Sequence, residues 1–187
     1  IYYKYPFLRG KSTKTFIGSR GCPFNCTFCT DPYFQALYRG KGRYLRMRAP
    51  RGFAEEIREQ KEILRFSTVT FDDEVFVWNR GWLREFLPLY REMVGLPFFC
   101  GVRADTLTEE IVGELRDSGC YGMSFGIESG SEHIRNEIGK KGITNEQILA
   151  AARWVKARGI VLRTTNMFCL PDETPERLAA IRTGAEA

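Results

Sequence analysis

Three closely spaced cysteines are the first indication of chemistry in this chain. Cys22, Cys26 and Cys29 fall within eight residues, and the next cysteine along the chain is Cys100. Cysteine thiolates are the usual protein ligands of iron–sulfur clusters, and a [4Fe–4S] cluster has four irons to bind. Three cysteines on one loop would bind three irons and leave the fourth open to a reactant. The spacing therefore predicts a [4Fe–4S] cluster at these three cysteines, which form the metal site and the catalytic centre.

Other uses of clustered cysteines fit the sequence less well. A structural zinc site usually has a second pair of cysteines or histidines, but the chain has one histidine, His133. A disulfide framework is typical of small secreted proteins, and no secretory leader is recognisable here. A cluster that only transfers electrons would need a fourth protein ligand. The remaining cysteines available for that role stand singly, at Cys100, Cys120 and Cys169.

Length and composition are those of one soluble globular domain. The chain has 187 residues, of which 43% are hydrophobic and 27% charged. No apolar run approaches the roughly 18 residues that a membrane-spanning helix needs. We therefore expect no membrane contact, and the free thiols favour a reducing, cytoplasmic location.

The positive charge is concentrated in one segment. The formal net charge is +5, and residues 39–51 contain six basic residues and no acidic one. Such a run is more often a solvated basic loop than a binding site. The other interpretation is a surface for RNA or another phosphate-rich partner, with Tyr44 available to stack on a base.

Five short apolar stretches bounded by turn residues are typical of strands. They are residues 15–18, 67–71, 97–102, 121–127 and 160–167. Helical patterns lie between them, at 53–64, after Asn79, at 108–118 and at 144–159. Pro88 is expected to kink or split the second of these helices. Shorter helices are expected at 32–37, at 131–138 and from Thr174, with an extended lead-in at 1–14 and a loop at 39–50.

This alternation of strands and helices predicts an α/β fold built from right-handed βαβ units. We expect a parallel sheet with both faces covered. Polar residues follow every predicted strand: the cysteines, Asp72-Asp73-Glu74, Arg103 with Asp105, Glu128-Ser129, and Arg163 with Asn166. Because ligands of parallel α/β folds bind at the carboxyl ends of the strands, these residues are expected to form one site.

Several motifs in this order resemble the catalytic core of the radical SAM superfamily. They are residues 19–29 with their C-x3-C-x2-C spacing, Phe71-Asp72-Asp73, residues 125–130 and residues 170–174. The likeness is to the subgroup whose members often carry a separate cobalamin-binding domain, and it covers residues 15–180. It implies a partial (β/α) barrel with about five of the usual six βα units. The domain then spans residues 1–187, with an N-terminal cobalamin-binding domain and the last barrel unit outside this sequence.

The resemblance also implies cofactors and site residues. The amino and carboxylate groups of S-adenosylmethionine would bind the open iron. Phe28 would lie near the adenine, and Glu128 would bind the ribose hydroxyls. The other implied cofactor contacts are Asp72 and Asp73 at the methionine amino group, Arg103 at the methionine carboxylate, and Ser129 and Asn166 at the ends of their strands.

The implied activity is reductive cleavage of S-adenosylmethionine to methionine and a 5′-deoxyadenosyl radical that abstracts hydrogen from a substrate. With cobalamin recruited, the outcome would be methyl transfer. The alternatives are a methylthiotransferase acting on tRNA and a non-enzymatic electron-transfer protein. The implied partners are an unidentified small molecule or RNA as substrate, and flavodoxin or ferredoxin as electron donor.

Two positions depart from the family pattern. Cys169 and Asp172 stand where glycines flank Leu-Pro in the fifth-strand motif. Cys169 is interpreted as a core cysteine, with a substrate-side thiol as the alternative. Cys100 and Cys120 are expected in the core as well.

Overall fold

A five-stranded parallel sheet forms the centre of the fold. The computed structural model describes residues 2–175. The strands lie side by side in chain order, each parallel to its neighbour: β1 (Thr13–Phe16), β4 (Thr68–Phe71), β5 (Phe98–Gly101), β6 (Cys120–Glu128) and β7 (Val161–Asn166). This order is the one that consecutive βαβ units produce. It confirms the predicted α/β class and the five strands.

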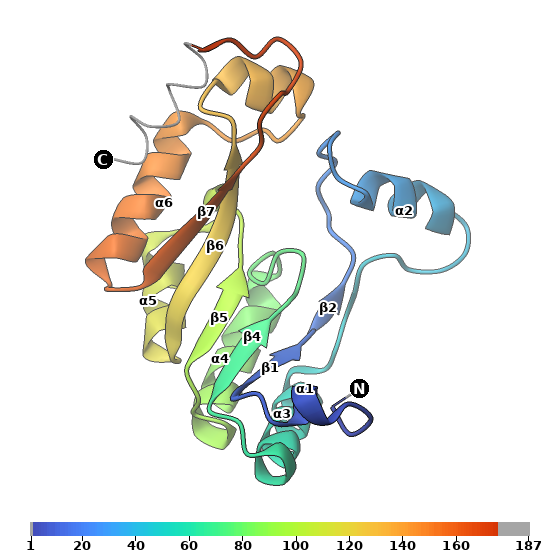
Figure 1. Cartoon of the computed structure of the whole chain (residues 1–187), viewed down its shortest axis with the longest axis vertical. Helices are drawn as coiled ribbons and strands as arrows, with labels where there is room; N and C mark the ends of the chain where they lie inside the picture. Colours follow the sequence, from blue (N-terminus) through green and yellow to red (C-terminus); the bar gives the residue numbers. More distant parts are fainter. Residues whose placement is uncertain (1, 176–187) are drawn as a thin grey trace.

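A helix precedes each of the last four strands of this sheet. These helices are α3 (Pro50–Leu64), α4 (Arg80–Met93), α5 (Glu109–Asp117) and α6 (Asn145–Ala157). Figure 1 shows them on the same side of the curved sheet, as in the outer layer of a barrel. Helices α4 and α6 have capped N-termini: the Asn79 side chain accepts a hydrogen bond from the Trp82 amide, and Thr144 and Gln147 form a capping box.

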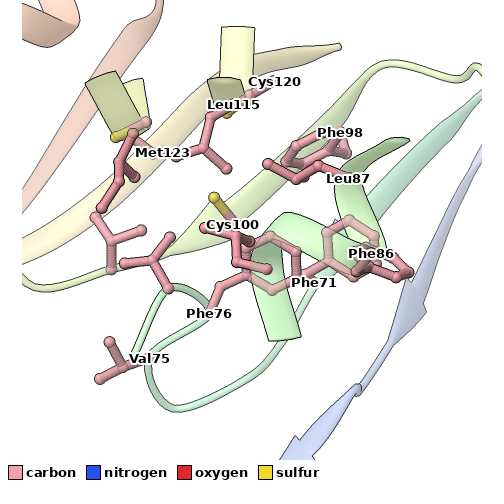
Figure 2. Close-up of a cluster of buried hydrophobic side chains, with 14 of the residues drawn as sticks. Phe71, Val75, Phe76, Phe86, Leu87, Phe98, Cys100, Leu115, Cys120 and Met123 are labelled. Atoms are coloured by element: carbon pink, nitrogen blue, oxygen red, sulfur yellow. The ribbon is translucent and has the colours of Figure 1, made fainter. Parts of the chain in front are cut away.

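The core lies between the sheet and these helices. Phe71 of β4 is 1% exposed and stacks on Phe76 with ring centroids 4.5 Å apart. Phe86 of α4 and Phe98 of β5 meet Phe71 edge to face. Cys100 and Cys120 are fully buried in this cluster, as predicted, and Figure 2 shows them beside the aromatic rings.

The opposite face of the sheet differs from the prediction that both faces are covered. Strand register places alternate residues on this inner face, and they are exposed or half-buried: Thr13, Thr15, Thr68, Thr70, Ser124, Arg163 and Thr165. No layer covers this face within residues 2–175. The prediction was wrong because a barrel strand has helices on one side only, so its residues alternate between buried and open positions.

The first fifty residues contain elements that the sequence did not predict. The lead-in includes the short helix α1 (Pro6–Arg9), and the segment predicted as loop contains β3 (Arg46–Met47). Strand β3 pairs antiparallel with β2 (Ser19–Arg20) and ties the basic segment to the chain that enters the cysteines. The predicted helix after the cysteines is α2 (Asp31–Tyr38).

Two prolines lie within helices, and Pro88 differs from the prediction. Helix α3 begins at Pro50, because proline lacks only an amide that has no partner in the first turn. Helix α4 continues through Pro88 without being split; Pro88 is exposed, while Phe86 and Tyr90 on the other side are buried.

Two predicted short helices remain. Residues 131–138 contain a π-helical turn, Ile134–Ile138. The predicted helix from Thr174 falls almost entirely on residues 176–187, which lie outside the described residues. Across residues 2–175, no helix has the length and apolar composition required to cross a membrane.

Candidate active site at the carboxyl ends of the strands

The cysteine loop, residues 21–29, begins just after β2 and lies at the carboxyl end of the sheet. Gly21 has φ +84°, and a Cβ there would come within 2.8 Å of the Tyr44 ring. Glycine is therefore the residue that fits this turn. The Gln35 side chain of α2 donates hydrogen bonds to the Cys22 carbonyl at 2.9 Å and the Phe24 carbonyl at 3.1 Å. Helix α2 thus fixes the loop backbone from one side.

Asp72 and Asp73, predicted together as cofactor ligands, lie on different sides of the chain. Asp73 is buried and accepts hydrogen bonds from the Gly18 amide at 3.2 Å and the Ser19 hydroxyl at 2.5 Å. Burial raises the pKa of the Asp73 carboxyl, and these hydrogen bonds oppose the shift. Asp72 is exposed, since successive residues of an extended chain point in opposite directions. Asp73 anchors the chain that enters the cysteine loop, and Asp72 is free to meet a ligand.

Arg103 is buried and connects the cysteine loop to the end of β5. Its Nη1 lies 3.3 Å from Cys26 Sγ, and its guanidinium lies 3.7 Å from the centroid of the Phe24 ring. Its other nitrogens donate to the Asp105 carboxylate at 3.0 Å and to the Lys141 carbonyl at 2.7 Å. Arg103 therefore ties the cysteine loop to the end of β5 and to the backbone of Lys141.

Lys141 is a site residue that the sequence did not reveal. Its Nζ donates to Glu128 Oε1 at 2.7 Å and lies 5.8 Å from the centroid of the Phe28 ring. The pair is largely buried, with side-chain exposures of 6% for Lys141 and 13% for Glu128. A Cβ at Gly126 would come within 1.8 Å of Glu128 Oε1, so only glycine leaves room for the carboxylate in this position. Lys141, Glu128 and Phe28 therefore form one cluster at the carboxyl end of β6.

Ser129 is held by the loop around it. It is buried, its hydroxyl accepts a hydrogen bond from the Ser131 amide at 3.2 Å, and its carbonyl accepts one from Arg135 at 2.6 Å. Arg135, also missed from the sequence, is 1% exposed and donates further to the Ile143 carbonyl and the Asn145 side chain. Burial lowers the pKa of the Arg135 guanidinium. These bonds fold residues 129–145 into the shape that presents Lys141.

Asn166 lies at the end of β7, opposite Glu128 in the strand register. Its Oδ1 is buried and has no hydrogen-bond partner among the described residues. A buried acceptor without a partner is costly unless a ligand supplies a donor. Asn166 therefore fits a polar group of a bound cofactor.

Cys169 is exposed, so the prediction of a core cysteine was wrong. Cys169 and Asp172 have φ of +61° and +62°, in the left-handed region that favours glycine. The backbone keeps a glycine-like conformation at both positions, while the side chains project outward.

The three thiols provide a donor set that fits an iron–sulfur cluster. Burial raises the pKa of Cys22 to about 11 and also raises the pKa of Cys29. Binding of iron must displace the thiol protons, so the affinity of the three cysteines for a cluster should fall as the pH is lowered. Within residues 2–175, no three Cys, His, Asp or Glu side chains gather closely enough to hold a single metal ion. A cluster binds each thiolate through a different iron, so its ligands need not meet at one point.

Residues 16–183 match the family model of the Radical SAM superfamily. An uncharacterized methyltransferase of Pyrococcus horikoshii is 30% identical over 168 residues, which are 87% of this chain and 34% of that protein. The cytidylyl-2-hydroxyethylphosphonate methyltransferase of Streptomyces wedmorensis is 26% identical over 84% of this chain and 29% of its own length. The chain thus spans about a third of the length of these relatives.

Solved structures share the fold. The radical S-adenosylmethionine methyltransferase TsrM of Kitasatospora setae, solved with tryptophan substrate and a S-adenosylmethionine analogue, is 20% identical with a TM-score of 0.78. The similarity covers 97% of this chain and 35% of TsrM. TsrM has also been solved with cobalamin and a [4Fe–4S] cluster bound. The match over residues 16–183 shows that the chain belongs to the Radical SAM superfamily, whose members use a [4Fe–4S] cluster and S-adenosylmethionine.

Proposed function

We propose that this chain is the cluster- and S-adenosylmethionine-binding core of a methyltransferase that uses cobalamin. The names of the two curated relatives and the ligands bound in TsrM support this reaction class. We place the cobalamin-binding domain and the barrel unit that would cover the inner face of the sheet outside this sequence. The observation that carries the proposal is the chain of contacts from Cys26 through Arg103 and Lys141 to Glu128.

Cys22, Cys26 and Cys29 would hold the cluster. When bound and reduced, a cluster of this kind supplies the electron that cleaves S-adenosylmethionine to methionine and a 5′-deoxyadenosyl radical. The chain's own contribution is to hold the cysteine loop in place. Gln35 fixes the loop from the side of α2, and Arg103 fixes it from the side of β5.

Four side chains would bind S-adenosylmethionine. Glu128 would accept hydrogen bonds from the ribose hydroxyls, and the exposed Asp72 would accept them from the methionine ammonium group. Lys141 has three N–H donors, of which one is given to Glu128, so the others can meet the methionine carboxylate. Asn166 Oδ1 would accept a donor from the adenosine.

Arg103 has a different role from the predicted carboxylate contact. Its guanidinium is already committed to Cys26, Asp105 and the Lys141 carbonyl. We therefore propose Arg103 as a positioning residue for the cysteine loop and for Lys141, with Lys141 as the cation that meets the methionine carboxylate.

The test uses the full-length protein, reconstituted without oxygen and supplied with cobalamin, S-adenosylmethionine and a chemical reductant. Transfer of the methyl group from S-adenosylmethionine to the reduced cobalamin predicts that S-adenosylhomocysteine and methylcobalamin form in equal amounts, as measured by mass spectrometry, and that the Cys26→Ala variant forms neither. Turnover of S-adenosylmethionine with labelled methylthio groups appearing in tRNA would overturn the proposal in favour of a methylthiotransferase. Absence of any turnover by the wild-type protein would contradict it altogether.

A further inference from the structure

Helix α2 carries its apolar residues on the outside. Tyr33, Phe34 and Leu37 form the outer side of the helix and are 66%, 43% and 45% exposed. Tyr38 is 40% exposed and lies at the edge of this side, with its ring centroid 6.0 Å from that of Tyr44. The polar residues Asp31 and Gln35 face inward, toward Tyr44 and the cysteine loop. A surface helix normally buries its apolar side, and a contiguous exposed apolar patch marks an interaction site. Figure 1 shows α2 standing apart from the sheet and from the other helices.

A cavity of about 640 Å³ adjoins this helix. The cysteine loop contributes Cys22, Pro23 and Asn25 to its lining, and α2 and residues 38–45 provide the rest. Among the described residues, no strand of the five-stranded sheet lines it. By contrast, Cys26 and Phe28 of the same loop face Arg103 and Lys141 at the carboxyl ends of the strands, here called the rim of the sheet. The cysteine loop therefore stands between this cavity and the proposed S-adenosylmethionine site.

The edge of the cavity is strongly basic. Arg39 and Arg43 line it, and Lys41 lies between them; all three are exposed. In the part of the chain that the structure describes, none of the three forms an ion pair; within residues 39–51 only Arg48 does, with Glu56. An apolar centre with a charged rim is the usual composition of a protein–protein interface. Unpaired cations at the rim attract a partner of negative charge.

We propose that the outer side of α2 together with residues 39–43, here called the α2 surface, docks an acidic one-electron carrier protein. Position decides between this partner and RNA. A nucleotide bound at the α2 surface would be separated from the proposed reaction site by the cysteine loop. An electron has only to reach the loop, and Cys22 lines the cavity. The reduced carrier loses one electron, and the group held by the three cysteines gains it.

This inference rests on the proposed cluster function, but it can be tested by binding alone. The test variant is the full-length protein with R39E, K41E and R43E combined. The matched control reverses three exposed arginines elsewhere, R80E, R91E and R153E, and so changes the net charge equally. Binding of oxidised flavodoxin and of ferredoxin is measured by biolayer interferometry at low and at high salt.

Charge complementarity predicts that the test variant raises the dissociation constant of at least one carrier by about tenfold or more, as for close charge pairs at interfaces. High salt should weaken binding to the wild type, and the control should differ from it by less than about twofold. Equal affinities of all three proteins for both carriers would overturn the proposal. Loss of tRNA affinity without loss of carrier affinity would overturn it in favour of an RNA surface.

Reductive cleavage of S-adenosylmethionine gives a second readout. The test variant should form 5′-deoxyadenosine about tenfold more slowly than the wild type when the carrier supplies electrons. With dithionite as reductant the two rates should be equal, because a small reductant needs no docking surface. Equal losses with both reductants would mean that the substitutions damage the cysteine loop and would contradict the proposal. Failure of the wild type with dithionite would instead count against the proposed function, leaving the binding comparison to decide the surface.

Discussion

Phe71 and Arg135 are both 1% exposed, but they are held by different interactions. Phe71 contacts five other aromatic rings in the core, among them Phe76, Phe86 and Phe98, which Figure 2 labels. Arg135 donates hydrogen bonds to three acceptors at the rim, each from another part of residues 129–145. Hydrophobic burial is nondirectional, so a core tolerates substitutions that conserve its volume, whereas a buried guanidinium depends on the placement of each acceptor.

The comparison extends to the ion pairs of the rim. Lys141 with Glu128 and Arg103 with Asp105 are largely buried, at N–O distances of 2.7 Å and 3.0 Å. Burying such pairs carries a desolvation cost that the attraction between the two charges offsets only in part. Apolar residues of similar volume at these positions would therefore stabilise the fold about equally. We infer that the core supplies stability and that these two ion pairs are present for the ligand site.

The core should give the largest effect on stability. Phe71→Ala removes a fully buried ring and is expected to lower the free energy of unfolding by about 3–5 kcal/mol. Urea denaturation followed by circular dichroism measures this change. Ile63→Ala on α3 is the control, because Ile63 is 52% exposed and should cost well under half as much. Similar losses for both variants would contradict the assignment of the core.

Arg135 should follow, since it is the rim charge that supports structure. Arg135→Met keeps an apolar side chain but leaves the Ser129 carbonyl without its donor, while the Ile143 carbonyl keeps a hydrogen bond from Asn136. We expect a loss of about 1–3 kcal/mol in unfolding free energy, the cost of one unpaired buried group. Arg153→Met, at an exposed position of α6, should be nearly neutral. A neutral Arg135→Met would show that water replaces the guanidinium.

Lys141 should separate binding from stability. Lys141→Met is expected to cost about 1–3 kcal/mol of stability, because it leaves the Glu128 carboxylate without its partner. Its affinity for S-adenosylmethionine should fall by about tenfold or more, which corresponds to about 1.4 kcal/mol. The adjacent Lys140 is exposed, so Lys140→Met should change neither quantity. Isothermal titration of the reconstituted protein measures the affinity, and an unchanged value for Lys141→Met would remove Lys141 from the site.

Alanine substitutions at two glycines should give the smallest changes in stability. Gly126→Ala displaces the end of the Glu128 side chain and should weaken S-adenosylmethionine binding with little loss of stability. Gly52→Ala in α3 meets no atom within 4 Å and should stabilise the protein by about 0.5–1 kcal/mol, since alanine favours helix. Thermal unfolding checks both variants, and a large loss of stability in Gly126→Ala would mean that the backbone of β6 is displaced as well.

Local patterns in the sequence were sufficient to predict the strands, the α/β class and the clustered cysteines. They could not predict contacts between distant segments. Arg103 meets Cys26 across 77 residues of chain, and no spacing within either segment indicates that contact. Lys140 and Lys141 are adjacent and identical in type, and only the folded loop buries one and exposes the other. Asp72 and Asp73 were likewise predicted to act together. Which of the two side chains is buried depends on where β4 ends, and the sequence does not show that.

The uncovered inner face was missed for a related reason. Threonines at alternate positions of β1 and β4 fit either a buried strand or a barrel interior, and the sequence was interpreted as the former. Pro88 was interpreted as a helix breaker, but it lies on the exposed side of a helix that continues past it.

The central claim is that three cysteines hold a cluster with one iron open to S-adenosylmethionine. Anaerobic reconstitution with iron and sulfide, followed by electron paramagnetic resonance of the reduced protein, tests it directly. The claim predicts a [4Fe–4S] signal that changes when S-adenosylmethionine is added. The signal should persist when Cys100, Cys120 and Cys169 are replaced together and disappear in Cys26→Ala. A reduced cluster signal that S-adenosylmethionine leaves unchanged would contradict the claim.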